Sequence, residues 1–121
     1  MPGIATLSGV ALDCPDPMAL AGFYSELSGW SLSSDSDETW AQLDTTGGWA
    51  LAFQRVEDYQ APVWPGQGVP QQFHLDFDVP DLDEGERQVL ALGARKAEHQ
   101  PGTTFRVFLD PAGHPFCLCR D

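Results

Sequence analysis

Hydrophobic residues alternate with polar or small ones in two short segments, one near the start of the chain and one past its midpoint. The first segment covers residues 10–14 and the second covers residues 75–79. A period of two is typical of a β-strand that buries one face. The pattern therefore predicts two strands, each with a buried face and a face that points away from the core.

A proline-containing corner and the start of a helix follow each predicted strand. Asp16 and Asp81 stand where an N-cap is expected, and Pro17 takes the first helical position, where its missing N–H costs nothing. Apolar residues spaced by three or four then predict two helices that end at Gly29 and Gly93. Their expected buried residues are Leu20, Phe23, Tyr24 and Leu27 in the first helix and Leu82, Val89, Leu90 and Leu92 in the second.

The two halves of the chain repeat one another at a constant shift of 65 residues. Asp13 matches Asp78 near the start of each half, and Gly48 matches Gly113 near its end (78 − 13 and 113 − 48). Repetition over such a length indicates two copies of one supersecondary unit.

Further strands complete each copy. Turn residues and short apolar runs predict them at residues 31–33, 39–43 and 51–55 in the first half and at residues 95–98, 104–109 and 116–120 in the second. The order strand–helix–strand–strand–strand makes the fold class α+β, with two βαβββ modules. We expect a single domain over residues 1–121, with modules at 1–60 and 72–121 and a connector at 61–71, because neither half alone could bury its sheet.

The composition narrows the function classes. The chain has 121 residues, of which 42% are hydrophobic and 20% charged, and its formal net charge is −12. Such a surface repels nucleic acid phosphates and anionic lipids, so we expect no nucleic acid and no membrane among the partners. The charge favours a cationic small ligand, although solubility alone explains it equally well.

The expected location follows from features that the sequence lacks. No apolar run reaches transmembrane length, and the first six residues contain no Lys, no Arg and no long apolar stretch, which argues against a signal peptide. The three cysteines are an odd number without a disulfide framework. We therefore expect a cytoplasmic protein with free thiols.

Several motifs, taken in order along nearly the whole chain, point to one superfamily. They are Asp13-Cys14-Pro15-Asp16-Pro17, Phe23-Tyr24, Leu27-Ser28-Gly29-Trp30 and Leu109-Asp110-Pro111-Ala112-Gly113-His114-Pro115-Phe116. Together they resemble the vicinal oxygen chelate superfamily of glyoxalases, bleomycin-resistance proteins and dioxygenases, and within it the small glyoxalase-like domain proteins of actinobacteria. The resemblance implies curved mixed sheets that form a cup, with helices outside, often completed by a second subunit in a homodimer.

Metal enzymes of this superfamily place their ligands on the first and last strands of each half. The resemblance puts these positions at Gly9, Ala52, His74 and Cys117. Gly9 and Ala52 carry no donor atom, whereas a firmly held metal needs three or four protein donors. We therefore expect no metal or other cofactor, and neither glyoxalase I nor extradiol dioxygenase activity. The alternative is an unusual divalent metal at His74, Cys117 and Cys119.

Strand alternation assigns candidate ligand-binding residues to the face that points away from the helices. They are Asp13, Gln54, His74, Asp76, Cys117 and Cys119, and Trp49 joins them at the expected opening of the cup.

Each of these residues also has a simpler interpretation. His74 can be a hydrogen-bonded residue of a half-buried sheet, Asp13 and Asp78 can stabilise turns, and the cysteines can be small buried side chains. The tryptophans that can either pack or line a ligand site are Trp40, Trp49 and Trp64.

Three functions fit these residues. The first is binding or sequestration of a small cationic or aromatic molecule, as in bleomycin-resistance proteins. The second is a lyase, isomerase or hydrolase in which His74 is the catalytic base and Asp76 or Cys117 assists, with or without an unusual metal. The third is a structural or regulatory domain with an empty cup. We take the first as the working hypothesis.

Overall fold

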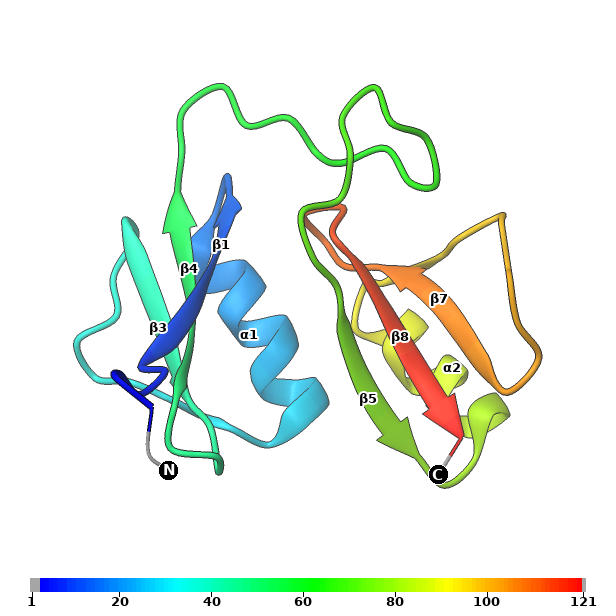
Figure 1. The fold of residues 1–121 in the computed structure, drawn as a ribbon, viewed down its shortest axis with the longest axis horizontal. Helices are drawn as coiled ribbons and strands as arrows, with labels where there is room; N and C mark the ends of the chain where they lie inside the picture. Colours follow the sequence, from blue (N-terminus) through cyan, green and yellow to red (C-terminus); the bar gives the residue numbers. More distant parts are fainter. Residues whose placement is uncertain (1–2, 121) are drawn as a thin grey trace. The chain divides into compact units, whose positions relative to one another are not determined.

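The chain divides into two compact units, Met1–Tyr59 and Gln60–Asp121. The computed structural model describes residues 3–120, and each unit contains one helix and one four-stranded sheet (Figure 1). The expectation that the units form a single domain stays a prediction.

The first unit contains β1 (Gly9–Cys14), α1 (Pro17–Ser28), β2 (Ser31–Leu32), β3 (Trp40–Asp44) and β4 (Ala50–Arg55). Its strands lie in the order β1-β4-β3-β2. Strand β1 runs parallel to β4, and the other neighbouring strands are antiparallel. The sheet is therefore mixed.

The second unit contains β5 (Leu75–Val79), α2 (Leu82–Ala91), β6 (Arg95–Lys96), β7 (Phe105–Leu109) and β8 (Pro115–Arg120). Its strand order, β5-β8-β7-β6, repeats that of the first unit, with β5 parallel to β8. This arrangement confirms the α+β class and the two βαβββ modules.

Both helices begin at the aspartates expected from the sequence. The Asp16 side chain accepts a hydrogen bond from the Ala19 N–H, and Asp81 accepts from the N–H groups of Asp83 and Glu84. These bonds satisfy donors that a helix leaves unpaired at its first turn. Gly29 ends α1 with φ 78°, the left-handed conformation that favours glycine.

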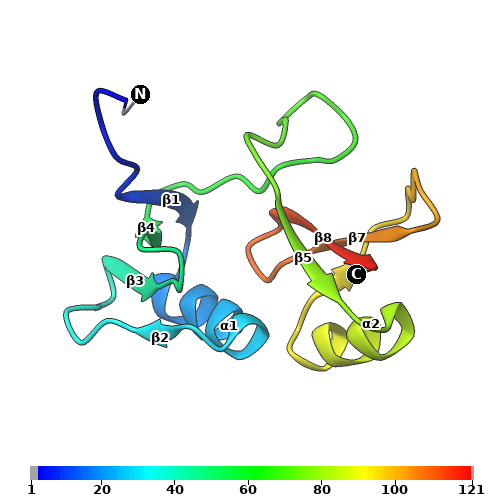
Figure 2. The same cartoon turned by 60° about the horizontal axis from the view of Figure 1, so that its bottom comes forward.

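Each helix covers one face of its own sheet (Figure 2). In the first unit the ring of Tyr24 stacks on that of Phe53, with centroids 5.7 Å apart, and in the second unit Phe108 stacks on Phe116 at the same spacing. Leu20 and Phe23 are buried as expected, while Leu27 is half-buried.

The prediction for the second helix was partly wrong. Leu90 and Leu92 are 41% and 36% exposed, and Leu82 is half-buried. Gly85 and Val89, one helical turn apart, face the sheet instead, so Leu90 points to another side of the helix. Leu92 lies beyond the last helical residue, Ala91. Among residues 3–120, no helix is long and apolar enough to cross a membrane.

Candidate functional site

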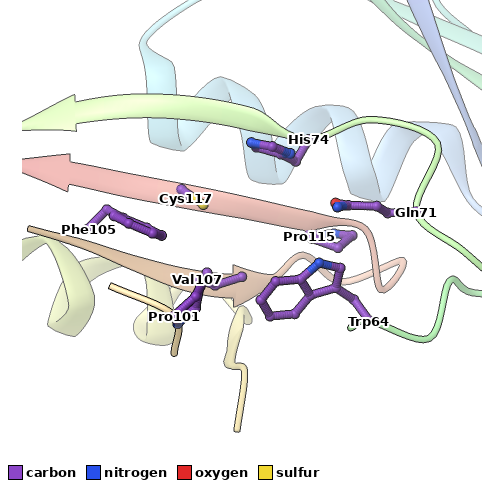
Figure 3. A pocket seen from close by; sticks show the side chains of 8 residues that line it. All are labelled: Trp64, Gln71, His74, Pro101, Phe105, Val107, Pro115 and Cys117. Atoms are coloured by element: carbon purple, nitrogen blue, oxygen red, sulfur yellow. The ribbon is translucent and has the colours of Figure 1, made fainter. Parts of the chain in front are cut away.

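A half-open pocket of about 220 Å³ lies in the second unit (Figure 3). It occupies the sheet face opposite α2, because Leu118 packs toward Gly85 of α2 and its neighbour Cys117 points the other way. Its lining residues are Trp64, Gln71, His74, Pro101, Phe105, Val107, Pro115 and Cys117.

The floor of the pocket is a small hydrophobic cluster. Cys117 and Val107 are buried there together with Ala97, and Trp64 and Phe105 pack against them. Cys117 and Val107 face one another across the antiparallel pair of β8 and β7. The floor is therefore part of the rigid sheet, which favours a site that exists before a ligand arrives.

One wall of the pocket is a loop that Gln100 holds in place. The Gln100 side chain donates to the carbonyls of Ala97 and Val107, at 2.8 and 2.9 Å, and accepts from the Val107 N–H at 2.9 Å. Further along this loop, a Cβ added at Gly102 would collide with the ring of Phe105. Glycine at this position therefore lets the Phe105 ring stand where it lines the pocket.

The connector supplies another wall. A hydrogen bond from the Val63 N–H to the Val69 carbonyl closes a loop around Trp64. The Trp64 ring lies 5.5 Å from the ring of His99, between centroids, and thus spans from the connector to the loop that carries Pro101. The expectation that Trp64 can line a ligand site agrees with this position.

The turn between β7 and β8 positions Pro115 and Cys117. Asp110, only 1% exposed, accepts hydrogen bonds from the N–H groups of Ala112 and His114 at 2.9 and 3.0 Å. Gly113 completes the turn with φ 91°. The motif that carried the family resemblance therefore has a structural role next to the pocket.

Three chemically active side chains meet at the edge of the pocket. The Nε2 atom of His74 lies 3.4 Å from Oδ1 of Asp76, and both side chains are about half exposed (45% and 57%). Asp76 pairs with the buried Cys117 across the parallel strands β5 and β8. One donor atom from each of the three residues lies within 4.8 Å of the others.

The environment keeps the Cys117 thiol protonated. Burial raises its pKa to about 12, and the Asp76 carboxylate adds to this by its charge and by accepting a hydrogen bond from the thiol. Burial also raises the pKa of Cys119, and the charges of Asp76 and Asp78 act in the same direction. Because the thiolate is the reactive form, neither cysteine is an activated nucleophile at neutral pH.

The residues do not fit the four-ligand metal site of the superfamily. Gly9 and Ala52 have no donor atom, and a Cβ at Gly9 would already lie 3.0 Å from the Ala50 carbonyl oxygen. Within residues 3–120, one set of side chains could hold an ion: His74, Asp76 and Cys117, all in the second unit. The alternative metal site expected from the sequence contained Cys119 as the third ligand, whereas the structure has Asp76 at that place.

Three of the other predicted site residues belong to the first unit, and the fourth, Cys119, belongs to the second. Asp13 and Gln54 are paired positions on β1 and β4 of the first unit, and both are exposed. Trp49 packs edge-on against Trp30, with centroids 6.0 Å apart. Cys119 packs against the pocket floor without lining the pocket.

The first unit has an open groove of its own at the corresponding strands, with a volume of about 380 Å³. It is lined by Ser8, Gly9, Val10, Ala11, Trp40, Gln42, Ala50 and Ala52. None of these lining residues is titratable. Both units therefore have a concave surface, but of these two linings only that of the second unit contains titratable side chains, His74 and Cys117.

Sequence reasoning missed several lining residues. Phe105 and Val107 alternate along a predicted strand, so their shared face could have been found from that pattern. Gln71 and Pro101 lie in segments without periodicity, and no signal in the sequence singled them out.

Comparison with known proteins agrees with this architecture. The model of the glyoxalase-like domain family matches residues 9–119, whereas no curated protein matches the chain. A glyoxalase/bleomycin resistance protein/dioxygenase family enzyme from Burkholderia phytofirmans PsJN has a similar structure, with a TM-score of 0.74 at 23% identity over 96% of this chain and 98% of that one.

Two further solved structures are similar to this chain. For a genomically encoded fosfomycin resistance protein from Listeria monocytogenes, the TM-score is 0.70 at 17% identity, over 98% of this chain and 95% of that one. For a glyoxalase-related enzyme from Fulvimarina pelagi, the TM-score is 0.68 at 21% identity, over 98% and 89%. At these identities the likeness shows the fold alone.

Proposed function

Because this chain belongs to the glyoxalase-like domain family, within the vicinal oxygen chelate superfamily, we propose that it binds or sequesters a small organic molecule in the pocket of its second unit. The observation that carries the proposal is the pocket itself. Its walls are aromatic, proline and valine side chains, and only a few polar groups converge on it. That combination is typical of small-molecule sites.

The size of the pocket limits what it holds. Its volume of about 220 Å³ is below the roughly 300–1,000 Å³ of sites for drug-sized ligands. The side chains of Trp64 and Phe105 offer flat surfaces to a ring. The proposed occupant is therefore one flat ring system, either a small molecule or a single group of a larger one.

Charge adds a preference for cationic ligands. The chain has a formal net charge of −12, and Asp76 stands at the pocket edge beside His74. A cationic group on the ring would meet this carboxylate while the ring lies against the apolar floor. This contact supports binding of a small cationic or aromatic molecule, the working hypothesis from the sequence, and it requires no metal.

A thermal-shift screen of small aromatic compounds, with cationic and neutral members of each ring type, tests the proposal. We expect a stabilising compound, because a ligand that binds only the folded state raises the melting temperature. Trp64→Ala should remove the shift, and Trp40→Ala, which changes an exposed tryptophan of the first unit, should preserve it. Shifts unaffected by Trp64→Ala, or no shift at millimolar concentrations, would overturn the proposal.

A second candidate is an enzyme of the lyase, isomerase or hydrolase type. The pair of His74 and Asp76, with 3.4 Å between Nε2 and Oδ1, favours it, because a carboxylate can orient an imidazole that accepts a proton. The protonated Cys117 thiol argues against covalent catalysis. If this candidate is right, the protein converts a ligand of the pocket into a product. His74→Ala should then abolish the conversion, while the variant should still bind the ligand.

An unusual metal belongs to this second candidate. Three donors and an open position suit a catalytic Zn²⁺ or Co²⁺. Titration with Co²⁺ should then give a thiolate-to-cobalt absorption band that Cys117→Ser abolishes and Cys119→Ser retains. A featureless titration would remove the metal from the candidate.

Assembly and location are also proposals. We propose a homodimer, on the resemblance to small members of the superfamily, and a reducing cytoplasm, supported by three free thiols. Light scattering that gives the mass of one chain at micromolar concentration would contradict the homodimer.

A further inference from the structure

One polar atom in the pocket lacks a protein partner. The Oε1 atom of Gln71 is buried, and no group of residues 3–120 donates a hydrogen bond to it. Gln71 lines the pocket, and Figure 3 shows its amide end pointing into the space bounded by His74, Pro115 and Trp64. Every other buried side-chain oxygen or nitrogen in the described part of the chain has a hydrogen-bond partner.

Such an atom is unfavourable in a folded protein unless something else pairs with it. A buried acceptor gives up its bonds to water, and the loss is recovered only when a donor is supplied. Gln100 shows the contrast, because its amide makes three hydrogen bonds to the backbone of Ala97 and Val107. The two glutamines therefore have different roles: Gln100 holds the wall, and Gln71 presents an acceptor to the interior.

The surroundings of Gln71 determine which donor can reach it. The side chains of Trp64, Phe105 and Pro115 surround the space with apolar surface, so a ligand group there is desolvated. A donor on the edge of a flat ring can point at Oε1 while the ring remains on these apolar walls. A ring without a donor fills the same space but leaves Oε1 unpaired.

We propose that Gln71 is a specificity-determining residue, and that the pocket selects flat rings carrying an N–H or O–H donor over rings of the same shape without one. The inference rests on the proposed function and deepens it, because it names the substrate class by its hydrogen-bonding chemistry. Sites built to pair with a donor discriminate strongly against analogues that lack it, since the buried protein group is then left unpaired.

A matched pair of probes tests the inference. Indole and benzofuran have nearly the same shape, but only indole carries an N–H donor. Dissociation constants are measured by titrating the ¹H–¹⁵N spectrum of the full chain with each probe. We expect indole to bind about tenfold more tightly than benzofuran, as one recovered hydrogen bond implies.

Two variants assign the preference to Gln71. Gln71→Met keeps the side-chain length and removes the amide, so the affinities for indole and benzofuran should become equal, with benzofuran bound at least as tightly as before. Gln72→Met changes the exposed neighbour and should keep the tenfold ratio. Because Gln71→Met removes an unpaired buried acceptor, its melting temperature should not fall, which checks that the variant folds.

The outcomes separate this inference from the proposed function. Equal binding of both probes to the unmodified protein, or a preference that survives Gln71→Met, would overturn the role of Gln71 and leave the pocket as a binding site. Failure of both probes to bind at millimolar concentration would overturn the proposed function and this inference together.

Discussion

Asp76 lies between an imidazole and a thiol: its Oδ1 atom is 3.4 Å from Nε2 of His74, and its strand position pairs with that of Cys117. One carboxylate therefore contacts the exposed histidine and raises the pKa of the buried cysteine. Burial is the largest cause of this raised pKa, and the Asp76 carboxylate adds to it.

Asp76→Asn should make Cys117 more reactive. Removing the carboxylate removes both its charge and a hydrogen bond that favours the protonated thiol, so the pKa of Cys117 should fall and its thiolate fraction should rise. Iodoacetamide labelling followed by peptide mass spectrometry near pH 9 measures the rate at each cysteine.

The control for this labelling is Asp78→Asn. Asp78 raises the pKa of Cys119 and is not among the groups that raise that of Cys117. This variant should therefore speed labelling of Cys119 alone. Acceleration of Cys117 by Asp78→Asn would instead indicate general loosening of the sheet.

The stability of the protein should decline at alkaline pH because of Cys117. The pKa of its thiol is about 12 in the folded state and about 8.5 in an unfolded chain. Between these values the unfolded state binds fewer protons than the folded state, so the free energy of unfolding falls as the pH rises. Urea denaturation at several pH values measures the slope.

Cys117→Ala should flatten that alkaline slope, although it lowers stability at neutral pH by removing a buried side chain. Val107→Ala is the matched control, since it removes a buried side chain from the same cluster but no thiol, and it should keep the slope. A slope that is the same in the unmodified protein and in Cys117→Ala would contradict the assignment.

Asp110→Ala should destabilise the second unit by about 2–3 kcal/mol, because the buried N–H of Ala112 and the part-buried N–H of His114 lose their acceptor. Asp110→Asn retains an acceptor oxygen and should lose less. Asp44→Ala, at an exposed position, should change the free energy of unfolding by less than about 0.5 kcal/mol. Chemical denaturation compares all three, and a neutral Asp110→Ala would contradict the role of this turn.

Gly102→Ala should weaken binding in the pocket. The new methyl group collides with the ring of Phe105, which must move from its place in the pocket wall. Gly68→Ala, in the connector, meets nothing within 4 Å and serves as the control. Indole affinity should fall several-fold for Gly102→Ala only. Unchanged affinity would show that the Phe105 ring is not part of the binding surface.

The fold could be predicted from the sequence because its signals are local and occur twice. The helix caps at Asp16 and Asp81 and the alternation along the first and last strands specify each module by themselves. The error at Leu90 arose because a helical pattern alone does not show which stripe faces the sheet, and Gly85 allows a close approach on a different side.

The site was less accessible to prediction. His74, Asp76 and Cys117 lie on strands whose faces follow from alternation, so their meeting was partly foreseen. The rest of the pocket comes from irregular segments, the connector with Trp64 and Gln71 and the loop with Pro101. The conformation of these segments depends on tertiary contacts such as the hydrogen bonds of Gln100. No periodic pattern in the sequence indicates such contacts.

The most direct test of the central claim is a crystal structure of the protein purified from the cells that make it. The account predicts electron density for a flat organic molecule between Trp64 and Phe105, with a donor atom within hydrogen-bonding distance of Gln71 Oε1. A pocket that contains only water, or a ligand bound elsewhere while this pocket stays empty, would contradict it.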